Sequence, residues 1–145
     1  MTNVSASSPE KSALLALQRA THATLQILAA RLVDLDLTAS EINVLAILAD
    51  GRGRTISELG AAAGTRPTTL TSVLDRLERR GHITRGARPG DRRVVVIELT
   101  ASGRLAASTI RQTLAELEER ALADLPAESI AGFHIVLRAL AEVSA

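Results

Sequence analysis

Apolar residues recur at helical spacing at both ends of the chain. Near the N-terminus they follow one side of a helix, at Leu14, Leu17, Leu25, Leu28, Leu32 and Leu35. We therefore expect one long helix over residues 10–35. Near the C-terminus two such stripes occur, comprising Leu105, Ile110, Leu114 and Leu117, then Ile130, Phe133, Val136, Leu137 and Leu140. Thr100 and Pro126 are expected to begin these two helices, and the first should run to about residue 123.

Three shorter helices are predicted between these ends. Segments 38–41 and 55–58 each carry the sequence Thr-x-x-Glu, a capping-box pattern that marks a helix start. The helix after the first box has an apolar stripe and should end at Asp50-Gly51; the helix after the second should end at Gly64. A third helix is expected over residues 65–80, with Thr65 as its cap and Pro67 in its first turn.

The pattern then changes to one typical of a β-hairpin. Segments 82–85 and 94–99 have β-forming residues, and Pro89-Gly90-Asp91 between them predicts a turn. Helix, short helix, helix and basic hairpin is the plan of a winged helix-turn-helix. The predicted fold is therefore mainly α with a small β-hairpin wing. We expect a single unit over residues 1–145, with the winged helix-turn-helix at 38–99 and dimerisation helices at 10–35 and 101–145. A two-fold dimer would bury the surplus apolar surface of the terminal helices.

Composition narrows the class of protein. The 145 residues suit one domain, and 46% of them are hydrophobic. The chain has no cysteine, which excludes disulfides and thiol-based redox sensing. No segment has the apolar length of a membrane span, and the polar start of the chain lacks the features of a secretion signal. We therefore expect a cytoplasmic protein.

Positive charge is concentrated in the middle of the chain. Residues 51–93 hold ten arginines and four acidic residues, a net charge of +6, whereas the remainder holds seven basic and twelve acidic residues. This distribution suits a surface that faces a polyanion. Charge alone leaves open the alternative of a solvated, arginine-rich surface.

The predicted helix 65–80 has two contrasting faces. Leu70, Val73, Leu74 and Leu77 line one face, and the other carries Thr68, Thr69, Thr71, Ser72, Asp75, Arg76 and Arg79. Hydroxyl groups and arginine can bond to phosphates and base edges, and a helix N-terminus attracts phosphate. The alternative is a plain solvent-facing helix, which the four weak helix formers in its first half argue against. Candidate DNA contacts are Arg66, Thr68, Thr69, Thr71, Ser72 and Arg76.

The hairpin tip is a second candidate for DNA contact. It has the sequence Arg88-Pro89-Gly90-Asp91-Arg92-Arg93, and arginine suits a narrow, electronegative minor groove. We expect Asp91 to brace a neighbouring guanidinium. A surface salt bridge on a turn is the alternative. The candidate contacts here are Arg88, Asp91, Arg92 and Arg93.

Catalytic and metal-binding chemistry is not indicated. His22, His82 and His134 lack ligand spacing, no phosphate loop or nucleophile elbow occurs, and no cofactor is expected. Three functions are to be distinguished: a ligand-responsive repressor, a winged helix that binds a protein, and an enzyme. The basic helix face favours the repressor.

Several motifs resemble the MarR family (multiple antibiotic resistance regulators) over about residues 11–143. The most specific are Asp91-x-Arg93 followed by Leu99-Thr100-x-x-Gly103, and Thr69-Leu70-Thr71-x-x-Leu74-Asp75-Arg76-Leu77-Glu78-x-x-Gly81. The resemblance implies that Thr68, Thr69, Thr71, Ser72 and Arg76 face the major groove and that Arg93 enters the minor groove beside Asp91. It also implies a homodimer, and a small anionic or phenolic effector whose pocket residues no motif identifies. Because a two-fold dimer presents two recognition helices, we expect a pseudo-palindromic operator.

Overall fold

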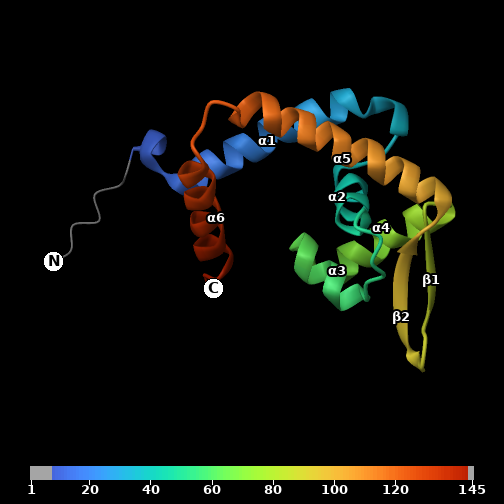
Figure 1. The fold of residues 1–145 in the computed structure, drawn as a ribbon. Coiled ribbons are helices and arrows are strands. Elements are labelled where there is room, and N and C mark those ends of the chain that lie inside the picture. The colour runs from blue at the N-terminus through green and yellow to red at the C-terminus, as the bar shows by residue number, and fades with distance from the viewer. Residues whose placement is uncertain (1–7, 144–145) are drawn as a thin grey trace. The chain divides into compact units, whose positions relative to one another are not determined.

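The computed structural model describes residues 8–143, and Figure 1 shows the chain. Its elements, in order, are η1 (Pro9–Lys11), α1 (Ala13–Arg31), η2 (Val33–Leu35), α2 (Ala39–Leu48), α3 (Ile56–Ala63), α4 (Pro67–Arg79), β1 (Ile83–Arg88), β2 (Asp91–Leu99), α5 (Ala101–Leu122) and α6 (Ala127–Ala141). The winged helix-turn-helix plan is confirmed. In the described part of the chain, no helix is long and apolar enough to cross a membrane.

Contacts divide the chain between Thr113 and Leu114, inside α5. The larger unit holds α1 to α4, the hairpin and the first half of α5. Its core consists of side chains from α2, α3, α4, the hairpin and α5, and the largest fully buried ones are Leu45, Leu48, Leu59, Leu70, Leu74, Leu77, Ile83, Ile97 and Ile110. All four residues of the predicted apolar stripe of α4 are buried. The 3.6-residue period therefore identified the core face of this helix correctly.

The prediction of one unbroken helix over residues 10–35 was wrong. Ser12 has an extended backbone and caps α1 by accepting a bond from the Leu15 N–H at 3.3 Å. At the other end, α1 stops at Arg31 and the chain tightens into the 3-10 turn η2, which Asp36 closes in a left-handed conformation (φ 51°). The chain has to leave the helix here because Thr38 must be extended to cap α2.

The first capping box is confirmed and the second forms in part. Thr38 Oγ1 accepts from the Glu41 N–H at 3.2 Å, and Glu41 Oε1 accepts from the Thr38 N–H at 3.3 Å. Thr55 Oγ1 likewise accepts from the Glu58 N–H at 3.1 Å. The Glu58 carboxylate, however, lies 3.6 Å from the Arg88 guanidinium, on the hairpin.

The hairpin is longer than its sequence pattern predicted. Strands β1 and β2 pair antiparallel from Ile83↔Leu99 to Arg88↔Asp91, with an irregularity at Ala87/Arg88. Arg54, in the α2–α3 loop, adds a bridge to Ile97 through backbone bonds of 3.1 and 2.7 Å. This bridge fixes the base of the hairpin to the helical part of the same unit.

Gly103 fixes the start of α5 against the hairpin. Thr100 caps α5 as predicted, because its Oγ1 accepts from the Gly103 N–H at 3.0 Å and donates to the Gly81 carbonyl at 2.6 Å. A Cβ at Gly103 would lie 1.9 Å from the His82 carbonyl oxygen, a contact that no real side chain makes. Only glycine therefore fits at this crossing.

The second unit consists of the end of α5 and α6, which begins after Pro126 as predicted. No described residue of α6 is buried. Instead, Phe133, Ile135 and Val136 on this helix are 46–65% exposed. A recess of about 300 Å³ within this unit is lined by Leu122, Leu125, Ile130 and Phe133, among others.

Candidate nucleic-acid interface

The outer face of α4 presents hydroxyl groups, as the sequence predicted. Thr68, Thr69, Thr71 and Ser72 are all exposed. Thr71 Oγ1 donates to the Pro67 carbonyl at 2.8 Å, so its lone pairs stay free to accept. The buried leucines of the opposite face fix the rotation of the helix about its axis. These hydroxyls therefore form one surface at the start of α4.

Arg66, not Thr65, occupies the N-cap position of α4. Arg66 has an extended backbone and makes no side-chain cap bond, and Pro67 follows in the first turn as predicted. The prediction that Thr65 caps the helix was wrong, because its hydroxyl donates to the Ala63 carbonyl at 3.3 Å and closes the preceding turn. The first N–H groups of α4 thus have no side-chain cap, and an exposed arginine stands beside them.

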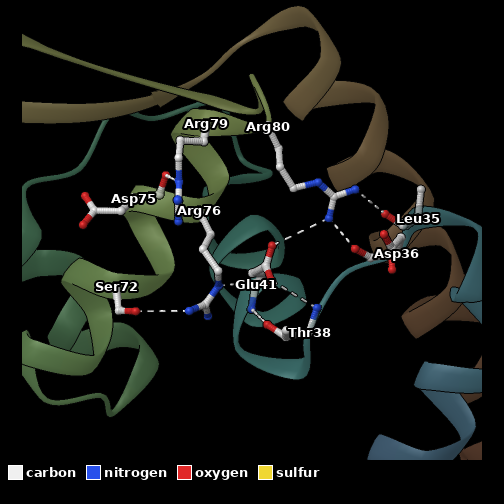
Figure 2. Close-up of polar contacts among 9 residues, drawn as sticks. All are labelled: Leu35, Asp36, Thr38, Glu41, Ser72, Asp75, Arg76, Arg79 and Arg80. Carbon is white, nitrogen blue, oxygen red and sulfur yellow. Dashed lines mark hydrogen bonds and ion pairs between the residues drawn. The ribbon is translucent and has the colours of Figure 1, made fainter.

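Arg76 is held by contacts within the protein (Figure 2). Its Nη1 donates to Ser72 Oγ at 3.1 Å, and its Nε lies 3.6 Å from Glu41 Oε1. The Glu41 side chain is only 4% exposed, whereas 39% of the Arg76 side chain remains accessible. Arg76 is therefore a partly accessible cation whose Nε side rests on a buried carboxylate.

Arg80 reaches the other oxygen of the same carboxylate. Its Nη1 lies 3.8 Å from Glu41 Oε2 and also donates to the Asp36 carbonyl, and its Nη2 donates to the Leu35 carbonyl at 3.0 Å. Arg80 thus joins the end of α4 to the turn between α1 and α2. Sequence reasoning treated Glu41 only as a helix cap and did not identify either ion pair.

Other arginines of the basic segment pair with acidic residues nearby. Arg85 on β1 bonds to Asp75 and lies 3.5 Å from Glu78, both on α4. Arg54 lies 2.8 Å from Asp50. Arg88 on β1 is paired with Glu58 on α3, although both side chains are about half exposed. These arginines connect elements, so the net charge of the segment overstates the number of free cations.

The wing tip holds Arg92 and Arg93, which make no ion pair with another described residue. Both are exposed, as is Asp91. The expected brace from Asp91 to a guanidinium takes another form, because Asp91 Oδ1 accepts from the backbone N–H of Arg93 at 3.0 Å. The carboxylate therefore orders the backbone of the turn instead of a side chain. Arg92 and Arg85 also line a shallow recess of about 320 Å³ beside Ile56 of α3.

The predicted contact residues fall into two groups. Arg66, Thr68, Thr69, Thr71, Ser72 and Arg76 lie on α4 or at its start, and Arg88, Asp91, Arg92 and Arg93 lie at the hairpin tip. One arginine at the start of α4 and two at the hairpin tip have no acidic partner among the described residues. This arrangement offers neutral donors and acceptors on α4, an exposed arginine at the start of this helix and two more at the hairpin tip.

Comparison with known proteins gives consistent results. Residues 37–95 match the MarR family. The chain is 38% identical over 69 residues to the uncharacterized HTH-type transcriptional regulator YcgE of Bacillus subtilis (strain 168); the match covers 47% of this chain and 45% of YcgE, less than half the length of either.

Solved structures match over nearly the whole chain. CouR from Rhodococcus jostii RHA1, bound to p-coumaroyl-CoA, aligns with a TM-score of 0.83 at 23% identity and covers 96% of this chain and 98% of that one. The reduced form of MarR from E. coli aligns with a TM-score of 0.70 at 25% identity, over 89% of this chain and 96% of that one.

Proposed function

Residues 37–95 match the MarR family, and on that premise we propose that this chain is a MarR-type regulator: a homodimeric, sequence-specific DNA-binding repressor that a small molecule releases from its operator. Members of the family regulate transcription and are not enzymes. The proposal places the protein in the cytoplasm, where its operator would be.

The observation that carries the proposal is the division of α4 into two faces. One face is wholly buried, and the other presents the hydroxyls of Thr68, Thr69 and Ser72 together with the partly accessible Arg76. A helix of this kind fits the major groove, where hydroxyls and arginine bond to phosphates and base edges. The exposed arginines of the wing tip suit the adjacent minor groove.

Dimerisation is proposed from the exposed apolar side chains of the terminal helices. Leu14, Leu15, Leu105, Phe133, Ile135 and Val136 are each 46–74% exposed in a single chain. Monomeric proteins rarely leave so many large apolar groups in water. A two-fold dimer would present two α4 helices, so we expect a pseudo-palindromic operator with half-sites about 10 bp apart.

The effector proposal rests on a relative. CouR was solved with p-coumaroyl-CoA bound, and its fold matches this chain almost from end to end. We therefore propose a small anionic or phenolic compound as the releasing ligand, without assigning its pocket.

Selection from a random-sequence DNA duplex library tests the proposal. The purified protein should enrich a pseudo-palindrome, and affinity for it should fall steeply with salt because arginine contacts release counterions. The enriched duplex should bind at least about a thousandfold more tightly than a scrambled duplex of equal length. Failure to enrich any sequence over several rounds would overturn the proposal.

A further inference from the structure

We propose that Glu41 is a positioning residue for DNA specificity: it holds Arg76 in the orientation that reads a guanine, a role that rests on the DNA-binding function proposed above. Glu41 is not on α4 and has almost no accessible surface, so it cannot itself touch DNA. Its influence must therefore pass through the arginines that it contacts.

The buried carboxylate of Glu41 is divided between structural and electrostatic contacts. Oε1 accepts the Thr38 N–H of the capping box and lies 3.6 Å from Arg76 Nε. Oε2 makes no hydrogen bond to the described residues, and lies 3.8 Å from Arg80 Nη1. A buried charge without a partner is costly. The two guanidinium groups therefore hold the Glu41 carboxylate in place, and the carboxylate holds the guanidinium groups in place.

Arg80 makes the carboxylate a fixed point. It donates to the carbonyl groups of Leu35 and Asp36, so its guanidinium is attached to the turn that precedes α2. Figure 2 shows Glu41 lying between Arg80 on one side and Arg76 on the other. Arg76 thus rests on an anchored anion and not on a mobile one.

Arg76 is also held from its other side. Its Nη1 donates to Ser72 Oγ, and because that oxygen accepts, the hydroxyl hydrogen of Ser72 is left to donate elsewhere. The exposed part of the Arg76 guanidinium offers donors only, and the Ser72 hydroxyl can add one more. Guanine is the base that presents two acceptors, N7 and O6, in the major groove. The pair therefore suits a G·C position in each half-site.

Fixing a guanidinium in advance raises discrimination among sequences more than it raises general affinity. A mobile arginine side chain can adapt to any phosphate. An arginine that is already immobilised loses less conformational entropy when it binds its matched base, and it fits a mismatched base poorly. Glu41 also places a negative charge beneath the DNA-facing surface. Its removal should therefore leave affinity for random DNA unchanged or increase it.

Glu41→Gln separates the two roles of this side chain. The amide oxygen can still accept the Thr38 N–H, so the capping box is kept while the charge is lost. Thr38→Ala is the matched control, because it removes the threonine bond of the cap and leaves the carboxylate and both arginines. The probes are the duplex enriched by the wild-type protein and a scrambled duplex of the same length and composition.

We expect Glu41→Gln to lower the ratio of enriched-duplex to scrambled-duplex affinity by roughly tenfold. Affinity for the scrambled duplex should not fall, and repeated selection should show relaxed preference at one G·C position per half-site. In an Arg76→Ala background, Glu41→Gln should change the ratio no further, because the two residues act as one unit. Thr38→Ala should lower the melting temperature but keep the ratio.

Distinct results would overturn the inference. It fails if Glu41→Gln keeps the wild-type affinity ratio, if it lowers affinity for both duplexes by the same factor, or if it changes the ratio equally in the Arg76→Ala background. A rise in affinity for both duplexes by the same factor would show that Glu41 only repels DNA, which also overturns it. Failure of the wild-type protein to enrich any duplex is a separate result, and it overturns the proposed function and this inference together.

Discussion

Arginine side chains in this chain serve two different purposes. Arg54, Arg80 and Arg85 are bound to acidic groups or carbonyls of neighbouring elements, and they join those elements. Arg66, Arg92 and Arg93 have no acidic partner among residues 8–143 and remain exposed. Arg76 combines features of both groups, because its Nε contacts the Glu41 carboxylate while part of its side chain remains accessible. Counting charges along the sequence cannot make this distinction.

Gly103→Ala should destabilise the protein by about 3 kcal/mol or more. The new Cβ would lie 1.9 Å from the His82 carbonyl oxygen, and backbone on both sides resists movement. Gly132→Ala is the control, because nothing lies within 4 Å of its Cβ and alanine favours a helix by about 0.5–1 kcal/mol. Urea unfolding of both variants measures the effect. Equal stability of Gly103→Ala and the wild type would contradict the close crossing of α5 and the hairpin.

His82 should make stability depend on pH. Burial lowers the pKa of His82 below its ordinary value of 6.5, and the nearby Arg80 charge lowers this pKa further, while Glu41 opposes the change. The folded protein therefore binds a proton less readily than the unfolded chain. This contribution to stability is present above about pH 6.5 and is lost as the pH falls through the folded-state pKa.

The measurement is the melting temperature between about pH 7.5 and about pH 5. His82→Gln should reduce the decrease seen in the wild-type protein on acidification, because glutamine does not titrate and can still bond to Ser102, whose Oγ lies 3.0 Å from His82 Nδ1. His22→Gln, at an exposed position of α1, should leave the decrease unchanged. An undiminished decrease in His82→Gln would assign it to other groups.

At the scale of elements, the sequence predicted what depends on local pattern. The burial of Leu70, Val73, Leu74 and Leu77 follows from spacing alone, and so does the start of α2 at Thr38. The outer parts of β1 and β2 were missed because Gly86 to Arg93 lack alternation, and pairing with the opposite strand makes them extended. The contacts of Glu41 with Arg76 and Arg80 join residues far apart in sequence, so no local pattern contains them.

In the wing, Arg93→Ala should weaken binding to specific and random duplexes by a similar factor, roughly tenfold. The side chain is exposed beyond the core, so the melting temperature should not change. The slope of affinity against salt should fall by about one counterion per wing. Arg111→Ala is the control, because it removes one exposed positive charge from α5, away from the wing, and should have little effect on DNA affinity. Wild-type affinity in a folded Arg93→Ala protein would show that the wing does not contact DNA.

Substitutions of Asp91 test whether its negative charge or its hydrogen bond to the backbone matters for DNA binding. Its carboxylate accepts from the Arg93 N–H, a bond that a neutral amide oxygen can also accept. Asp91→Asn should therefore bind DNA as the wild type does, whereas Asp91→Ala should bind more weakly because the turn loses order. Binding titrations on the enriched duplex compare the two variants. A loss in Asp91→Asn as large as in Asp91→Ala would favour a role for the charge itself.

For the whole molecule, the second unit gives the strongest reason to expect a partner chain. No described residue of α6 is buried, although the helix carries Phe133, Ile135 and Val136. Apolar surface of this kind is stable in water only when something covers it. A second copy of the chain is the economical cover, because a two-fold axis would use the same surface twice.

Ile135→Lys should convert the protein to a monomer while each chain keeps its helices. Ile135 is 65% exposed in the single chain, so a lysine there costs little within the protomer, but it would bury a charge in a dimer interface. Glu128→Lys, on an exposed position of the same helix, changes charge without touching the apolar surface and should remain dimeric. Sedimentation at micromolar concentration measures the mass.

The same variant should also bind DNA more weakly. Because a monomer presents one α4 helix, its affinity for the enriched pseudo-palindrome should fall by at least about a hundredfold, towards that for an isolated half-site. A dimeric Ile135→Lys protein with normal affinity would move the interface away from α6.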